Sequence, residues 1–211
     1  MPRRGALDYE RNVFINCPFD AEYAPLFEAI VFTVIDCGFV ARCAREADDA
    51  SEPRISKLLA IIGQCRLGIH DISRTEPNRA GLPRFNMPFE LGLFLGAKRY
   101  GITRQRRKSC LILDRDRFRY QAFLSDIGGQ DISAHDGQPE RVIRIVRDWL
   151  RASGVPWSAQ LPGGAAIVSR YEGFRAELPT LCATAKRADD ELTFLDFVAT
   201  TETWLEENPR T

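Results

Sequence analysis

The sequence is poor in residues that bind metals. It contains only two histidines, and its six cysteines are scattered without any Cys-x-x-Cys pair. Zinc sites need several cysteine or histidine ligands at close spacing, so no metal is expected. The scattered cysteines instead fit small buried side chains in a reducing compartment. Glycine-rich phosphate loops are missing as well, because neither Gly-x-Gly-x-x-Gly nor a P-loop motif occurs.

The chain also lacks a net charge and a long hydrophobic run. Lys and Arg together number 29, as do Asp and Glu, so no global field favours nucleic acid or an anionic membrane. The longest apolar run, Ala29–Ile35, is too short to cross a bilayer, and Met1–Glu10 is unlike a signal peptide. We therefore expect a cytoplasmic protein with neither a membrane nor a nucleic acid as partner. The basic run Lys98–Lys108 is expected to be a solvated turn rather than a nucleic-acid contact.

Short apolar segments alternate with helical patterns along most of the chain. This alternation predicts an α/β fold: a flavodoxin/Rossmann-like, three-layer parallel sheet of about five strands with helices on both faces. The expected strands are Val13–Cys17, Phe39–Cys43, Leu67–Ile69, Cys110–Leu113 and Gln130–Ser133. The expected helices are Asp20–Ile35, Arg54–Gln64, Met87–Tyr100, Tyr120–Ile127 and Pro139–Ser153.

A segment rich in glycine and proline divides the sequence. Residues 1–153 form the expected α/β domain, and residues 154–164 are interpreted as a linker. Residues 165–211 are expected to form a C-terminal helical pair, Ala165–Ala188 and Asp189–Glu207. Such a pair has little core of its own, so it should pack on the α/β domain or on a second subunit.

Glu90 is the only ionisable side chain in the apolar stretch Met87–Ala97. Asn86 is the expected N-cap, Pro88 is tolerated in the first turn, and the helix is apolar nearly all round, so it should be buried. An unpaired carboxylate there costs several kcal/mol unless it has a function, and the helix dipole should keep it ionised. The alternative is a capping-box glutamate, although the box position after Asn86 would be Phe89.

Other candidate residues follow the predicted strands, at the edge where ligands bind parallel sheets. The first turn offers Asn16, Phe19, Asp20 and Tyr23 for contacts with a base and a sugar, although the two aromatic residues could equally be core residues. Asp71 follows the third strand, where it could accept hydrogen bonds from ribose hydroxyls or simply cap a turn. His70 beside it is more typical of a structural residue than of an acid or base.

Arginines cluster in two of the loops near these residues. Guanidinium groups suit nucleotide phosphates, although most surface arginines are simply solvated. The first cluster includes Arg42, Arg45, Arg54 and Lys57, and the second includes Arg74, Arg79 and Arg84. Gly92 and Gly96 lie four apart on one helical face and are expected to allow close packing inside the protein.

Three segments together resemble the nucleoside 2-deoxyribosyltransferase-like and TIR-like superfamily. They are N-C-P-F-D from Asn16, H-D-I-S-R from His70 and N-M-P-F-E-L-G-L-F-L-G from Asn86, within a region of roughly 11–150. The resemblance implies that Glu90 is catalytic and that Asp71 contacts the nucleoside. It also implies base and ribose binding by the first turn, at Asn16, Phe19, Asp20 and Tyr23.

The chain departs from the transferases before the glutamate helix. Residues 82–86 read L-P-R-F-N, where the transferases usually have a D-x-G-T-like stretch. The arginine-bearing loop and the extra helices look closer to the bacterial branch implicated in nucleotide or NAD cleavage during phage defence. This departure favours hydrolysis over transfer between bases.

Together these features predict a hydrolase that cleaves the N-glycosidic bond of a nucleotide, with an NAD-like dinucleotide as first candidate. Glu90 would stabilise or capture the ribosyl cation without any metal or separate cofactor. The expected substrate-binding residues are Asn16, Phe19, Asp20, Tyr23, Arg42, Asp71, Arg74 and Asn86. The alternatives are a non-catalytic nucleotide sensor, a TIR-like assembly scaffold and a deoxyribosyltransferase. Expected partners are a second copy, through the C-terminal helices, and a second defence-system protein.

Overall fold

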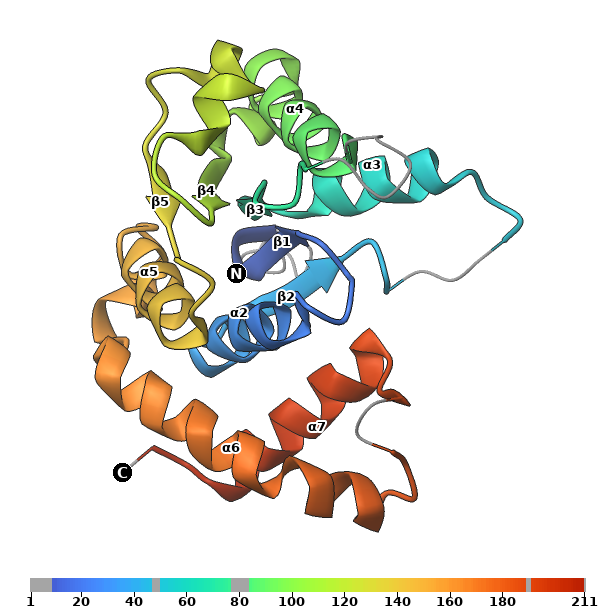
Figure 1. Ribbon diagram of the computed structural model, residues 1–211, viewed down its shortest axis with the longest axis vertical. Helices are drawn as coiled ribbons and strands as arrows, with labels where there is room; N and C mark the ends of the chain where they lie inside the picture. The colour runs from blue at the N-terminus through green and yellow to red at the C-terminus, as the bar shows by residue number, and fades with distance from the viewer. Residues whose placement is uncertain (1–8, 47–49, 77–83, 189–190, 211) are drawn as a thin grey trace.

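The computed structural model describes residues 9–46, 50–76, 84–188 and 191–210. Five parallel strands form one sheet in the order β2-β1-β3-β4-β5 (Figure 1). The predicted α/β fold is therefore confirmed. The strands are β1 (Asn12–Asn16), β2 (Val40–Cys43), β3 (Leu67–Asp71), β4 (Ser109–Asp114) and β5 (Ile132–Ala134).

Helices cover both faces of the sheet, as the continuous apolar character of the central strands requires. Every residue of β1 and of β3 is buried. One face is covered by α2 (Ala24–Asp36) and α5 (Pro139–Arg151), whose buried side chains form the main core with the sheet. The other face is covered by α3 (Arg54–Gln64) and α4 (Asn86–Tyr100).

Several predicted helices differ from the structure. In the C-terminal pair, the first helix ends at Thr184 rather than Ala188, and the second begins at Phe194 rather than Asp189. Helix α2 begins at Ala24 rather than Asp20, because the Asp20 carbonyl accepts the backbone N–H of Tyr23 in a preceding turn. The predicted helix Tyr120–Ile127 is wrong. Its place is taken by two short 3-10 turns, η2 (Arg119–Ala122) and η3 (Ser125–Ile127), too short for helical propagation. A third such turn, η1 (Gln105–Arg107), precedes β4.

The C-terminal helices pack directly on α2. A turn, η4 (Pro156–Gln160), leads into α6 (Gly164–Thr184), and α7 (Phe194–Glu207) follows. Phe32 of α2 stacks on Phe174 of α6 with ring centroids 5.2 Å apart, and Trp204 of α7 packs against both rings. The α/β part and the helical pair therefore share one hydrophobic core.

Helix α4 is only half buried, which corrects the prediction of a helix buried all round. Met87, Glu90, Leu91 and Phe94 face the protein at helical spacing, whereas 56% of Phe89 is exposed. Gly92 and Gly96 lie on the outer side, and a Cβ at either position would meet no atom within 4 Å. Their predicted role in close internal packing is therefore wrong.

The basic run Lys98–Lys108 does not end in a solvated turn. Lys108 is only 2% exposed, and its ammonium group donates hydrogen bonds to the carbonyls of Ile62 and Cys65. It also lies 4.3 Å from the centre of the Phe94 ring. Lys108 therefore connects the end of α3 to the start of β4. Within the described ranges, no helix combines the length and apolar character needed to cross a membrane.

Candidate active site at the carboxyl end of β1

In the sheet, β2 lies on one side of β1 and β3 lies on the other side, so the chain changes direction after β2. This reversal of direction at β1 and β3 makes their carboxyl ends the switch point of the sheet, where ligands bind in folds of this strand order. A pocket of about 140 Å³ lies there. It is lined by Asn16, Cys17, Pro18, Phe19, Arg54, Arg84, Asn86, Met87 and Glu90.

Glu90 is held in the pocket by the second turn of α4. Phe85 is the N-cap residue, and no side chain caps the helix, so the predicted capping role of Asn86 is wrong. The third position of the helix is then Pro88, which also rules out a capping box at Glu90. Because Glu90 lies beyond the first turn, it receives less help from the helix dipole than the sequence suggested.

Glu90 is largely buried, and its carboxylate has no partner among the described residues. The residue is 8% exposed, and no hydrogen bond or ion pair joins it to another residue of the described chain. Burial raises its pKa from 4.5 to about 7, and the nearby Arg54 guanidinium acts in the opposite direction. The expectation of a fully ionised carboxylate is therefore corrected: near neutral pH, the protonated and ionised forms coexist.

Asn16 positions the start of α4 relative to the sheet. Its side-chain amide donates a hydrogen bond of 2.9 Å to the Met87 carbonyl and lies 3.1 Å from Nδ1 of His70. Burial lowers the pKa of His70 to about 3, and the positive charge of Lys108 acts in the same direction. His70 is therefore neutral near pH 7 and serves a structural contact, as the sequence favoured.

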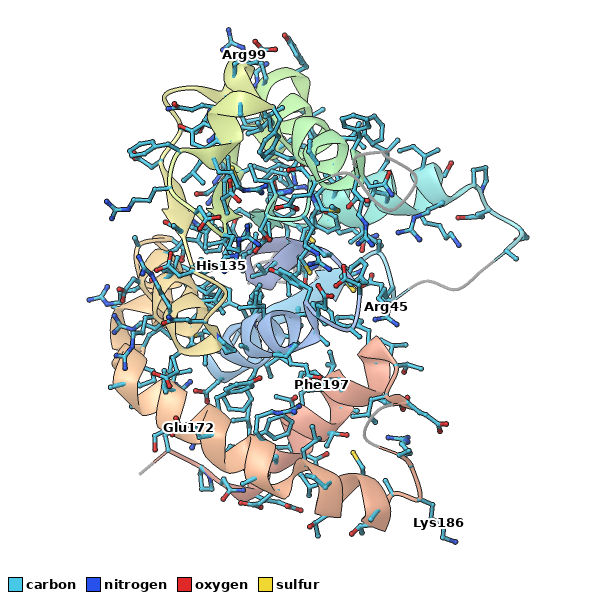
Figure 2. The ribbon with its side chains drawn as sticks, viewed as in Figure 1. Arg45, Arg99, His135, Glu172, Lys186 and Phe197 are labelled. Atoms are coloured by element: carbon cyan, nitrogen blue, oxygen red, sulfur yellow. The ribbon has the colours of Figure 1, made fainter. Side chains whose placement is uncertain are left out.

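Charged residues surround the mouth of the pocket. Arg84 and Arg74 both form ion pairs with Asp20, at 2.7 and 2.8 Å. Burial by itself would raise the pKa of Asp20, but the two arginines outweigh it and hold the pKa below its ordinary value. The Arg45 guanidinium lies 5.5 Å from the centre of the Phe19 ring, at the loop after β2 (Figure 2).

Asp71 belongs to a separate, closed cluster. It is fully buried, and its carboxylate accepts hydrogen bonds from the Tyr23 hydroxyl at 2.5 Å and from the backbone N–H of Ser73 at 2.8 Å. His135, which follows β5, lies 3.0 Å from the same carboxylate. The turn contact to Ser73 is thus present, while no atom of Asp71 lines the pocket.

The pocket brings together only part of the predicted set. Asn16, Phe19, Asn86 and Glu90 line it, and Asp20 and Arg74 connect to it through Arg84. The other three predicted residues, Tyr23, Arg42 and Asp71, lie outside its lining. Arg42 is bound instead to Glu46 and Gln64.

The lining also includes Arg54 and Arg84, which belong to the arginine clusters found in the sequence. The sequence pattern did not distinguish these two arginines from the others in their clusters. His135 was missed as a partner of Asp71. Its position directly after a strand was the available signal. Arg79 of the second cluster lies outside the described residues.

The part of the chain that the structure describes contains no group of three or more side chains arranged to hold a metal ion. Comparisons with protein-family models, with curated proteins and with solved structures found no match.

Proposed function

We propose that the protein hydrolyses the N-glycosidic bond of a nucleotide in the Glu90 pocket, with an NAD-like dinucleotide as first candidate. The observation that carries the proposal is the buried Glu90 carboxylate, which faces a pocket and has no partner in the described chain. A buried, unpaired carboxylate costs several kcal/mol. This cost is explained if a ligand supplies the missing interaction.

The proposed reaction makes use of the ionised form of Glu90. When the bond between C1′ of the sugar and the base nitrogen breaks, the electron pair leaves with the base and the sugar becomes an oxocarbenium ion. A fixed carboxylate stabilises this cation, and water then adds at C1′ and releases one proton to the solvent. Protonation of Glu90 removes the charge, so kcat should rise with pH through about 7, the pKa of Glu90.

The size of the pocket suggests how a nucleotide would lie. At about 140 Å³ it is smaller than the roughly 300–1,000 Å³ of pockets that enclose drug-sized ligands. It would therefore enclose the sugar and leave the phosphates at its mouth. Arg54 and Arg84 line the pocket with exposed guanidinium groups that suit phosphate oxygens.

The test is to incubate the purified protein with NAD and a panel of nucleotides and to measure the released base by chromatography. Glu90→Gln keeps the shape of the side chain and removes the charge, so we expect at least about a 100-fold loss of activity. Glu177→Gln, at an exposed site on α6, is the matched control. Release that Glu90→Gln leaves unchanged would overturn the proposed mechanism.

A nucleotide sensor without catalysis is the second candidate, and one observation favours it. Asp71, the acid expected to hold the ribose, is closed off by Tyr23, so Glu90 is the only acid among the described residues of the pocket lining. In a sensor, Glu90 would hold a ribose hydroxyl. Thermal stabilisation by a nucleotide with no product after long incubation would support this function.

The remaining alternatives concern assembly and transfer. An assembly scaffold predicts self-association that needs no ligand and survives Glu90→Ala. Self-association through the C-terminal helices and a second defence-system protein also stay predictions. A deoxyribosyltransferase would exchange the base only when a second base is supplied.

A further inference from the structure

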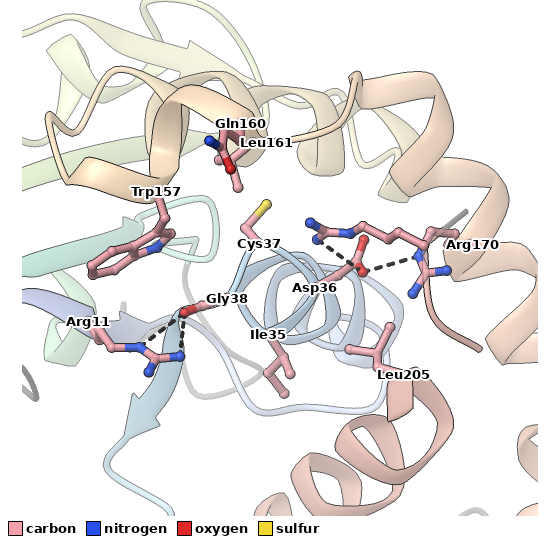
Figure 3. A pocket seen from close by; sticks show the side chains of 11 residues that line it. Arg11, Ile35, Asp36, Cys37, Gly38, Trp157, Gln160, Leu161, Arg170 and Leu205 are labelled. Carbon is pink, nitrogen blue, oxygen red and sulfur yellow. Dashed lines mark hydrogen bonds and ion pairs between the residues drawn. The ribbon is translucent and has the colours of Figure 1, made fainter. Parts of the chain in front are cut away.

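Figure 3 shows a second pocket, of about 610 Å³. It includes Arg11, just before β1, whereas the Glu90 pocket includes Asn16 at the other end of that strand. Arg11, which precedes β1, and the end of α2 at Asp36–Gly38 form part of its lining. The other walls come from the C-terminal part of the chain, including Trp157 of η4 and Arg170 of α6. Its volume falls within the roughly 300–1,000 Å³ typical of small-molecule sites.

One wall of this pocket holds a buried acceptor that is only half satisfied. Asp36 is 5% exposed, and its Oδ1 atom lies 3.1 Å from Nε of Arg170 and 3.3 Å from Nη2 of Arg210. Its Oδ2 atom is buried and has no hydrogen-bond partner among the described residues. Such atoms are rare because a buried acceptor without a hydrogen bond is destabilising, so a ligand group that donates a hydrogen bond would stabilise Oδ2.

The facing wall holds a buried hydrogen-bond donor that also lacks a partner among the described residues. The Trp157 ring packs against Phe39 with centroids 5.5 Å apart, and the Arg11 guanidinium lies 5.7 Å from the Trp157 ring centre. The indole Nε1 atom of Trp157 is buried without a partner among the described residues. Figure 3 shows Trp157 and Asp36 on opposite sides of the pocket, with Cys37 between them.

The charge of the lining favours an anion. The described residues of the lining include three guanidinium groups, of Arg11, Arg170 and Arg210, and one carboxylate, that of Asp36, which gives them an excess of two positive charges. The Arg11 guanidinium donates to the Gly38 carbonyl through Nε and Nη2, which leaves Nη1 for a ligand. Guanidinium groups with such spare donors suit phosphate oxygens.

We propose that this pocket binds a nucleoside monophosphate with an amino-substituted base. The amino group would donate to Oδ2 of Asp36, a ring nitrogen would accept the indole N–H of Trp157, and the phosphate would pair with a guanidinium group. This site is separate from the Glu90 pocket, because none of the described residues lines both. A ligand bound in this pocket would contact both the end of α2 and the C-terminal helices.

The test is calorimetric titration of the full chain with three probes: AMP, IMP and adenosine. AMP should bind at least about tenfold more tightly than IMP, which lacks the amino group, and than adenosine, which lacks the phosphate. The proposal would be overturned if IMP or adenosine bound as tightly as AMP. It would also be overturned if AMP did not bind at concentrations up to the millimolar range.

Variants then assign the binding to this pocket. Trp157→Phe keeps an aromatic ring and removes the donor, so it should weaken AMP binding about tenfold and remove any AMP-dependent change in Trp157 fluorescence. Arg11→Gln should also weaken binding, whereas Arg151→Gln, at an exposed position outside both pockets, should not. If Arg84→Gln weakens AMP binding while Trp157→Phe leaves it unchanged, AMP binds elsewhere and the proposal fails.

Discussion

Replacing Glu90 with glutamine should stabilise the protein at neutral and alkaline pH. The pKa of Glu90 is about 7 in the folded protein, against an ordinary value of 4.5 for a glutamate in an unfolded chain. Between these two values of pH the folded protein keeps a proton that the unfolded chain has released, so stability falls as pH rises. The gap between the two pKa values corresponds to about 3 kcal/mol. Glutamine carries no charge and avoids this loss.

The assay is urea and thermal unfolding of the wild type and Glu90→Gln between pH 4.5 and 8.5. The difference in the free energy of unfolding should be near zero at pH 4.5 and about 3 kcal/mol in favour of Glu90→Gln at pH 8. For a chain of this length, that difference corresponds to roughly 6–12 °C in Tm. The other titrating groups are common to both proteins, so their contributions cancel in the difference between the two free energies of unfolding. Glu177→Gln measures what the same substitution does at an exposed site.

The outcome bears directly on the proposed function. A difference in stability that does not change with pH would mean that the folded protein holds the Glu90 carboxylate at no cost. The central argument for a ligand at this site would then be lost. A difference that grows with pH, together with a loss of base release in Glu90→Gln, would show a residue kept for activity at the expense of stability.

Three other substitutions test the packing around the site. Lys108→Met should destabilise the protein by about 1–3 kcal/mol in urea unfolding, because two buried carbonyls lose their donor. Tyr23→Phe should cost a similar amount, about 1–3 kcal/mol, because the buried Asp71 carboxylate loses a hydrogen bond, and the loss should appear in the same assay. Gly68→Ala should lower Tm and cost about 1–3 kcal/mol, because its Cβ would lie 2.8 Å from the Phe94 ring.

Features set by short-range patterns could be predicted from the sequence. Helix α3 begins and ends at the predicted residues Arg54 and Gln64, since its apolar side chains recur at helical spacing. All five strands lie where apolar segments had suggested them, with ends shifted by one or two residues. The position of Glu90 in a helix beside the sheet follows from the same kind of local pattern.

Features that depend on distant partners could not be predicted. Lys108 looked solvated because its neighbours in sequence are basic, yet its two acceptors come from the end of α3, more than forty residues earlier. His135 lies next to Asp71 only because β5 and β3 flank β4 in the sheet. The half-exposed state of α4 also depends on its place in the fold, because only the side of the helix with Met87, Leu91 and Phe94 is covered, while Phe89 stays exposed.

The carboxyl edge of the sheet contains its own comparison for Glu90. Asp71 and Asp114 are both fully buried there, and both have partners: Asp71 has Tyr23 and Ser73, and Asp114 has Arg119, whose Nη2 donates at 2.7 Å. The fold can therefore supply partners to buried acids at this edge. Glu90 lies at the same edge, faces a pocket and has none within the described residues. Both of its carboxylate oxygens therefore await a partner, as expected if the partner is a ligand that the protein binds only during function, whereas Asp114 lacks a partner only at Oδ2.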